Sequence, residues 1–287
     1  MILVLGAGGT VGRHLCNELE TRGVEYRAAY RDAAKLEAAL AEDIDAVEVD
    51  LARPQTIKAA MADIERVFLL TAATPQLAEL ERNAISAALK AGVRHVVKVS
   101  VWEADTADYS FARWHAPAEE ALAESGLSYC LLRPNGFMQS AAQGMEATVR
   151  DHGAFYTPTA RAAAAYVDAR DVAACASALL VDDPPVPERR VWELTGSEAL
   201  DAHAVAECLS QAIRKPVRAV EVSASVYRDG LLAAGMPEWM ADALVDMSER
   251  QSQGGFGRVT EDIETLTGEK PRTLADYFAE VAENFRN

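Results

Sequence analysis

The first twelve residues limit what this chain can fold into more than any other segment. Met1–Leu5 is an apolar run of the length of a buried strand, and a glycine-rich turn and a helix-forming segment follow it. Glycine in such a turn leaves room for a sharp change of direction and for a phosphate beside the helix N-terminal amides. The GxxGxxG spacing therefore predicts a dinucleotide-binding turn. Its expected cofactor contacts are Gly6, Ala7, Gly9, Thr10, Val11 and Gly12.

Short apolar runs alternate with longer amphipathic segments through the first half of the chain. Strands are expected near 1–5, 24–30, 45–49, 65–70, 94–99 and 128–133, with helices between them. Parallel strands need such crossover helices, so the alternation predicts an α/β fold with a Rossmann-type doubly wound parallel sheet. Further strands are expected at 163–167, 190–194 and 217–222, and the remaining segments are mostly helical.

The sequence predicts two domains. Residues 1–152 are expected to form an NAD(P)-binding Rossmann domain. Residues 153–287 are a mixed segment that first returns to the sheet, over about 163–196, and then forms a smaller, mostly helical substrate lobe over about 197–287.

The charge balance narrows the range of partners. The chain has 28 basic and 44 acidic residues, a formal charge of −16, which disfavours phosphate backbones and anionic lipid surfaces. No stretch of eighteen consecutive apolar residues and no signal sequence is present. We expect a cytoplasmic protein that acts on a small molecule, without nucleic acid or membrane partners. A homo-oligomer remains open.

The cysteines give no sign of a metal site or a disulfide framework. Cys16, Cys130, Cys175 and Cys208 lie far apart without the paired spacing of zinc ligands. They are expected to be reduced and to pack as small hydrophobic residues, and no metal is predicted.

Residues beyond the second and third strands bear on the choice of cofactor. Arg31 lies where an NAD-specific enzyme usually places a carboxylate, and its guanidinium can pair with a 2′-phosphate. NADP is therefore preferred, with NAD as the alternative, because neighbouring Asp32 weakens the argument unless it is a helix N-cap. Asp50 is placed to accept a hydrogen bond from an adenine amine, although a loop or cap aspartate is an equal alternative.

The segments after the fourth, fifth and sixth strands are expected to line the site, because ligands of doubly wound sheets lie beyond the carboxyl ends of the strands. With the residue after Asp50, they add the cofactor contacts Leu51, Thr71, Ala72, Ser100, Pro134 and Asn135. Pockets for flat aromatic molecules are mostly apolar. Trp102, Phe137, Met138 and Tyr156 are therefore the expected substrate contacts, with a core position as the alternative for each.

Several motifs together resemble the NmrA-like group of atypical short-chain dehydrogenases/reductases. They are Gly6–Gly12, Tyr30–Asp32, Val49–Leu51, Val67–Thr71, His115-x-x-x-Glu119 with Ser125-Gly-Leu, Leu132–Met138, Val167–Ala173 and Leu194–Gly196. The resemblance covers nearly the whole chain. It implies a Rossmann domain with a small C-terminal lobe, similar to NADPH-dependent quinone reductases and triphenylmethane dye reductases.

The Tyr-x-x-x-Lys pair that transfers protons in ordinary members of that superfamily is missing. Counted back from Glu119, His115 occupies the lysine position and Phe111 the tyrosine position. The resemblance thus implies a ribose contact for His115, expected on the helix surface. Catalysis by His115, whose pKa would lie near 6.5, is an alternative. A displaced Tyr109-x-x-x-Arg113 pair is another.

The missing tyrosine shapes the predicted chemistry. Carbonyl reduction needs a proton donor at the developing alkoxide, whereas hydride addition to a quinone or a cationic dye delocalises the charge. We predict an NAD(P)H-dependent oxidoreductase that passes hydride to a small electron-poor, quinone-like, dye-like or conjugated substrate. The alternative is a non-catalytic NAD(P)-sensing regulatory protein that acts through a protein partner.

Overall fold

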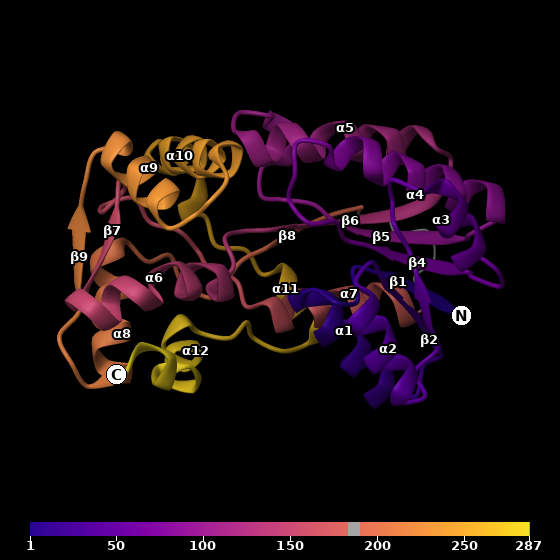
Figure 1. The fold of residues 1–287 in the computed structure, drawn as a ribbon, viewed down its shortest axis with the longest axis horizontal. Helices are drawn as coiled ribbons and strands as arrows, with labels where there is room; N and C mark the ends of the chain where they lie inside the picture. Colours follow the sequence, from indigo (N-terminus) through magenta and orange to yellow (C-terminus); the bar gives the residue numbers. More distant parts are fainter. Residues whose placement is uncertain (183–189, 287) are drawn as a thin grey trace. The chain divides into compact units, whose positions relative to one another are not determined.

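The computed structural model describes residues 1–182 and 190–286 (Figure 1). The chain forms two compact units, and each unit is built from three separate stretches of the sequence. Unit 1 comprises Met1–Thr106, Ala112–Arg133 and Ala169–Glu193, and unit 2 comprises Ala107–Phe111, Pro134–Asp168 and Leu194–Asn287. The division into domains at residue 152 stays a prediction, and residues 183–189 and 287 of the second predicted domain lie outside the described residues.

Among the described residues, seven strands form one sheet in the order β3-β2-β1-β4-β5-β6-β8. The strands are β1 (Ile2–Leu5), β2 (Tyr26–Tyr30), β3 (Ala46–Glu48), β4 (Arg66–Leu69), β5 (His95–Val99), β6 (Ser128–Pro134) and β8 (Val191–Leu194). Ile2 of β1 pairs in parallel register with Tyr26 and with Arg66. This strand order is that of a Rossmann sheet and confirms the predicted fold class.

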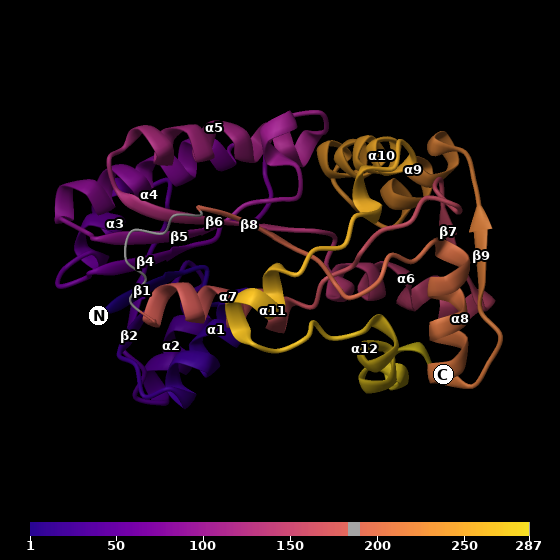
Figure 2. The same ribbon diagram turned by 180° about the vertical axis from the view of Figure 1, so that it is seen from behind.

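Helices cover both faces of the sheet of unit 1, and Figures 1 and 2 agree on their sides. One face carries α1 (Thr10–Thr21), α2 (Ala33–Ala41) and α7 (Ala169–Val181), and the other carries α3 (Pro54–Ala60), α4 (Leu77–Ala91) and α5 (Ser110–Glu124). A strand covered on both faces is mostly apolar, and Leu3 and Val4 of β1 are accordingly fully buried. The core beneath the turns after β1, β4 and β5 therefore holds these turns in place.

Unit 2 has a small sheet and a core of its own. β7 (Ala154–Thr157) and β9 (Arg218–Glu221) pair in parallel. α6 (Met138–His152) packs against β7, α8 (Ala202–Ile213) packs against β9, and α12 (Leu274–Glu280) packs against both helices. The core includes Phe155, Leu209 and Phe278. The other α-helices of this unit are α9 (Ala224–Ala233), α10 (Glu238–Ser252) and α11 (Asp262–Thr267). β9 confirms the strand predicted at 217–222, whereas β7 was not predicted.

The strand predicted at 163–167 is wrong. Its residues form only isolated bridges, from Ala164 to Leu200 and from Val167 to Phe137, while the amide of Ala165 donates to the carbonyl of Phe256. The segment is rich in alanine, which lacks the branched side chains that favour strands. Its backbone groups are therefore satisfied by several neighbours instead of one ladder.

The cysteines are free thiols, as predicted. Cys16, Cys130 and Cys175 are buried, and Cys208 is partly exposed. Burial raises the pKa of Cys130 to about 11, so that this thiol is protonated and packs as an apolar group at neutral pH.

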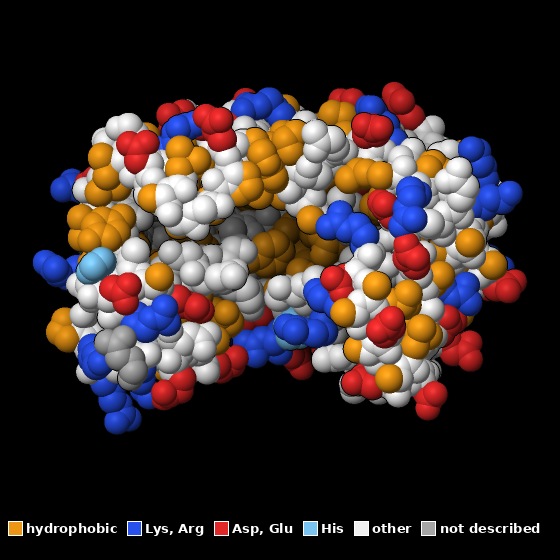
Figure 3. Space-filling view, in the orientation of Figure 1, with side chains coloured by type: hydrophobic (Ala, Val, Ile, Leu, Met, Phe, Trp, Pro, Cys, Tyr) orange, Lys and Arg blue, Asp and Glu red, His pale blue; other side chains and the backbone are white. Residues whose placement is uncertain are grey.

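The surface carries charges of both signs. On the face drawn in Figure 3, Lys and Arg side chains are mixed with Asp and Glu side chains. Within the part of the chain that the structure describes, no helix is both long enough and apolar enough to cross a lipid bilayer.

Candidate cofactor and reduction site

The three glycines of the turn after β1 differ in what requires them. Gly6 has a φ of +87°, and a Cβ there would lie 2.6 Å from the carbonyl oxygen of Leu70. A Cβ on Gly12 would lie 2.1 Å from the carbonyl oxygen of Gly6. On exposed Gly9, by contrast, the nearest atom would be that same oxygen at 3.3 Å. Gly6 and Gly12 thus serve the packing of the turn, whereas Gly9 keeps space free for an incoming group.

The N-terminus of α1 presents open backbone amides. No side chain caps it at Gly9, and its first helical hydrogen bond runs from the amide of Arg13 to the carbonyl of Gly9 at 3.0 Å. The amides of Thr10, Val11 and Gly12 have no hydrogen-bond partner among the described residues. Such amides, at the positive end of the helix dipole, favour a bound anion. The turn therefore fits the pyrophosphate of a dinucleotide.

Two cationic side chains lie beyond β2. Arg31 is exposed and has no hydrogen-bond or ion-pair partner among the described residues, while Lys35 Nζ donates to the carbonyl oxygen of Gly8 at 2.8 Å. Lys35 was not among the predicted contacts, although its place in the first turn of α2, four residues after Arg31, is a usable signal. The carboxylate of Asp32 accepts from the amide of Lys35 at 2.9 Å, which confirms that Asp32 is a helix N-cap.

Several polar groups of the loop after β3 form hydrogen bonds within the loop. Asp50 accepts from the amide of Ala52 at 3.0 Å and from Arg53 Nε at 3.0 Å. The amide of Ala52, followed by Arg53, holds the pKa of Asp50 below its ordinary value. The carbonyl of half-buried Leu51 accepts from Asn83 Nδ2 at 2.9 Å. These contacts fit the alternative that Asp50 is a loop aspartate. A contact of Asp50 with the adenine stays a prediction.

The parallel strands bring several predicted residues to one edge of the sheet. Gly6, Thr71 and Ser100 follow β1, β4 and β5, which are neighbours in the sheet, and Pro134 ends β6 next to them. Thr71 is half-buried and Ala72 is exposed. This edge is the one at which doubly wound sheets bind their ligands.

A fully buried ion pair lies behind this edge. Lys98 of β5 and Glu81 of α4 are both 0 % exposed, and Lys98 Nζ lies 2.5 Å from Glu81 Oε2. Burial raises the pKa of Glu81, and the charge of Lys98 opposes this shift. Neither residue was among those predicted for the site. A lysine inside the apolar run His95–Val99 was the available signal, because a buried charge needs a partner.

His115 joins this pair and is not on the helix surface, so that expectation is wrong. The side chain is 6 % exposed, and its Nδ1 lies 3.1 Å from Lys98 Nζ. Burial, with the neighbouring charge of Lys98, lowers the pKa of His115 well below its ordinary value of 6.5. The imidazole is therefore neutral at pH 7, because α5 turns it toward β5 and away from water. Its roles as ribose contact or catalytic group stay predictions.

A second buried cluster explains the motif residues Glu119 and Arg133. Arg133 pairs with Glu119 through two nitrogens, with Nε lying 3.1 Å from Oε1, and reaches Asp105 at 2.9 Å. The hydroxyl of Ser100 also donates to Glu119. The pairing ties α5 to β6, so these motif residues have a structural role. The hydroxyl proton of Ser100 is used in this cluster, and its cofactor contact stays a prediction.

Two further sequence positions are held by contacts within unit 2. Asn135 Nδ2 donates to the carbonyl of Phe256 at 2.9 Å, and Asn135 Oδ1 accepts from the amide of Gly136 at 2.7 Å. Tyr109 is fully buried, and its ring centre lies 5.5 Å from that of Phe256. Tyr109 precedes the first residue of α5, whereas Arg113 lies within α5. Their spacing is therefore not that of one helix face.

The predicted substrate contacts divide between the units. Trp102 belongs to unit 1 and is fully buried. Phe137, Met138 and Tyr156 belong to unit 2, where Met138 is part of the core, Phe137 is half-buried and Tyr156 is 41 % exposed. A common apolar wall formed by these side chains stays a prediction.

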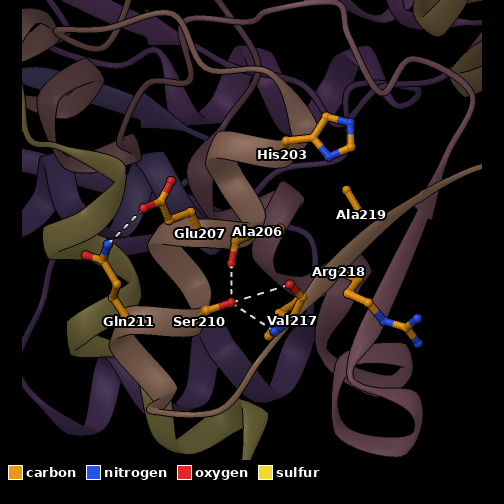
Figure 4. A pocket seen from close by; sticks show the side chains of 8 residues that line it. All are labelled: His203, Ala206, Glu207, Ser210, Gln211, Val217, Arg218 and Ala219. Atoms are coloured by element: carbon orange, nitrogen blue, oxygen red, sulfur yellow. Dashed lines mark hydrogen bonds between the residues drawn. The ribbon is translucent and has the colours of Figure 1, made fainter.

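A groove in unit 2 lies outside the predicted site. It has a volume of about 520 Å³ between α8 and β9, and Figure 4 shows its lining: His203, Ala206, Glu207, Ser210, Gln211, Val217, Arg218 and Ala219. The hydroxyl of Ser210 donates to the carbonyl of Ala206 at 2.6 Å and accepts from the amide of Val217 at 2.8 Å. This hydroxyl thus joins the helix to the strand.

The sheet order, the uncapped α1 behind a glycine turn and the cations beyond β2 together define a nucleotide-binding protein of the Rossmann class. The model of the NAD(P)H-binding family matches residues 6–183. The chain therefore belongs to this family of NAD(P)H-binding proteins, and the predicted resemblance is confirmed.

Several relatives of the chain are reductases that match along nearly their full length. The chain is 31 % identical to the NAD(P)H azoreductase of Xenophilus azovorans, with 96 % of each chain covered. It is 33 % identical to the (4-alkanoyl-5-oxo-2,5-dihydrofuran-3-yl)methyl phosphate reductase of Streptomyces griseus, with 99 % of each covered. The NADPH-dependent quinone oxidoreductase of Escherichia coli, solved with NADPH, superposes with a TM-score of 0.89 at 27 % identity, covering 98 % of this chain and 99 % of that one. The protein is an NAD(P)H-dependent oxidoreductase.

Proposed function

We propose that the protein binds NADPH along the N-terminus of α1 and reduces a small, electron-poor conjugated molecule of the quinone or azo-dye kind. The observation that carries this proposal is the set of open amides on α1, above the unobstructed Gly9 and in the same unit as exposed Arg31. When bound, NADPH supplies the hydride. The residues of the chain bind the cofactor, orient it and exclude water.

We further propose which residues contact each part of the cofactor. The amides at the start of α1 take the pyrophosphate, and the loop of Asp50 and Leu51 lies at the adenine. The residues assigned to the remainder of the cofactor are Thr71, Ala72, Ser100, His115, Pro134 and Asn135. Gly6, Ala7 and Gly12 shape the turn that carries the amides.

Arg31 and Lys35 account for a preference for NADPH over NADH. A 2′-phosphate carries negative charge, and the chain as a whole, at −16, repels it. Arg31 is free to pair with this phosphate, and Lys35 adds a second positive charge at the glycine turn. NADH lacks the 2′-phosphate and therefore gains nothing from a pair with Arg31.

The acceptor is a molecule that does not need a strong proton donor. Phe111 stands where the superfamily has its tyrosine, and His115 is neutral at pH 7. The relatives are an azoreductase, a quinone oxidoreductase and a reductase of a dihydrofuranone phosphate, all named for conjugated substrates. Trp102, Phe137, Met138 and Tyr156 supply the apolar contacts to such a molecule. We place the protein in the cytoplasm, with no nucleic acid or membrane partner, and leave a homo-oligomer open.

The regulatory alternative is not favoured, because the full-length relatives named above are reductases. The deciding experiment follows NADPH and NADH consumption by absorbance with quinones, azo dyes, cationic dyes and enones. Simple aldehydes serve as the control class, since their reduction requires a proton donor. Turnover of a conjugated acceptor supports the proposal. Tight cofactor binding without turnover across the panel contradicts it and supports a sensor.

A further inference from the structure

The buried ammonium of Lys98 has a complete set of neighbours. Its Nζ lies 2.5 Å from Glu81 Oε2, 3.2 Å from the carbonyl oxygen of Val99 and 3.1 Å from His115 Nδ1. Lys98 and Glu81 are both fully buried. No other hydrogen-bond or ion-pair partner of Lys98 occurs among the described residues.

The chemistry of these neighbours fixes the direction of each hydrogen bond. An ammonium group has three N–H donors and no acceptor. The carboxylate of Glu81 faces the ammonium as its ion-pair partner, and the carbonyl oxygen of Val99 accepts one of its N–H donors. Because the ammonium can only donate, a further N–H points to Nδ1 of His115, which must then carry its lone pair. In a neutral imidazole the proton consequently lies on Nε2.

We propose that Lys98, held by Glu81, is a positioning residue that locks His115 in the Nε2–H tautomer, so that His115 acts as a neutral hydrogen-bond donor to an oxygen of the bound ligand. Nε2 has no hydrogen-bond partner in the described ranges, and it is the one donor that His115 has left. His115 then does not transfer a proton as an imidazolium. The identity of the ligand rests on the proposed function, whereas the tautomer does not.

The other charged groups around His115 do not compete for its ring. Glu119, one turn further along α5, is taken by Arg133 and by the hydroxyl of Ser100. Arg133 also forms an ion pair with Asp105 through Nη1. Glu81 faces Lys98 and not the imidazole. The charge that acts on His115 is thus the ammonium, which opposes protonation together with burial.

The first measurement is nitrogen NMR of the protein with ¹⁵N-labelled histidine, assigned with the His115→Gln variant. We expect Nδ1 of His115 to show the shift of a nitrogen with a lone pair and Nε2 that of an N–H, unchanged between about pH 5.5 and 8. An Nδ1–H tautomer, or an imidazolium in this range, would overturn the proposal. This result needs no substrate, and it requires only the natural protein and the His115→Gln variant used for the assignment.

The second measurement exchanges the two charges. The Glu81→Lys/Lys98→Glu variant keeps an ion pair but places a carboxylate beside Nδ1. We expect Nδ1 to become protonated and the pKa of His115 to rise above about 6.5, with a matching inflection in the pH profile of kcat that the natural protein lacks. An unchanged tautomer in the folded variant would show that Lys98 does not set it. Lys90→Met, on the exposed side of α4, is the control and should change neither readout.

The third measurement locates the ligand oxygen. Titration with NADP⁺ alone should shift the Nε2–H signal if a cofactor oxygen accepts it, whereas a shift only on adding a quinone to the NADP⁺ complex assigns the acceptor oxygen. No shift with either would overturn the donor role. Cofactor binding is followed in the same samples, so that failure of the proposed function, seen as no binding, is distinguished from failure of this inference.

Discussion

The glycine turn and the buried cluster around Lys98 belong to the same unit but use their polar groups differently. In the turn, the amides of Thr10 and Val11 have no partner among the described residues, and the side chain of Arg31 is exposed. In the cluster, the donors of Lys98 meet Glu81 and two further acceptors, out of contact with water.

This difference separates ligand binding from positioning. Unused hydrogen-bonding capacity at a surface is available to a ligand, whereas buried polar groups are costly unless they satisfy one another. Substitution of a turn residue that faces the open space, such as Gly9, should therefore change cofactor affinity with little effect on folding. Substitutions in the cluster should change stability first, because they leave a charge without its partner.

The largest effect is expected when one member of the buried pair is removed. Lys98→Met leaves the carboxyl of Glu81 in the core alone and should cost about 3–5 kcal/mol of unfolding free energy. Removing both charges, in Glu81→Leu/Lys98→Met, should recover most of that loss. Urea unfolding at pH 7 measures both variants, with Lys90→Met as the exposed control. Equal losses in the single and double variants would mean that the pair does not act as a unit.

The next effect concerns the glycine turn. Gly9→Val fills the open space in front of α1 and should weaken both NADPH and NADH at least 100-fold, about 2.7 kcal/mol, while the unfolding free energy changes by less than about 1 kcal/mol. Gly12→Ala should do the reverse and destabilise the fold, because its Cβ would lie 2.1 Å from a carbonyl oxygen. Retained cofactor affinity in Gly9→Val would place the pyrophosphate elsewhere. Cofactor titration and urea unfolding distinguish these results.

The two regions also differ in how far the sequence predicts them. The strand, the glycines and the start of α1 follow one another within a short segment, so local spacing was enough to predict the turn. Arg31 could be predicted for the same reason, from its place directly after a strand. Lys35 is as local as Arg31, but its contact with the carbonyl of Gly8 depends on how α2 meets the turn.

The buried cluster could not be predicted in this way. Glu81, Lys98 and His115 come from α4, β5 and α5, and their contact depends on which face each helix turns toward the sheet. The motif around His115 indicated a ribose contact and suggested a surface position. The structure shows instead that the ring is buried against a lysine that no motif contains. Local patterns identified the residue, and only the packing of three elements revealed its surroundings.

A smaller effect separates the two cations at the turn. Arg31→Ala should weaken NADPH about 10- to 100-fold by removing a charge-assisted pair of about 1.5–3 kcal/mol, with little change for NADH. Lys35→Ala should weaken NADPH only a few-fold, because its ammonium already donates to Gly8. Titration of both cofactors with each variant tests this order. Equal losses of NADPH and NADH in Arg31→Ala would remove the argument for cofactor choice.

The smallest effect concerns Asp50, the side chain near the turn that already has partners within its loop. Its pKa is lowered in the folded protein, first by the amide of Ala52 and then by Arg53. A lowered pKa stabilises the fold above the unfolded value of about 3.9, and this contribution is lost as the pH falls through the folded value. Asp50→Asn should therefore cost less than about 1 kcal/mol at pH 7, with the difference from the natural protein shrinking below about pH 4.

Paired urea unfolding at pH 7 and at about pH 3 measures this difference, with exposed Asp63→Asn as the control. NADPH titration of the same variant then decides whether Asp50 also contacts the cofactor. If Asp50→Asn lowers the unfolding free energy and leaves the affinity for NADPH unchanged, Asp50 has only a structural role in its loop. A loss of affinity larger than the loss of stability would place it with the open groups of the turn, because the carboxylate would then still be contributing an acceptor to the adenine amine.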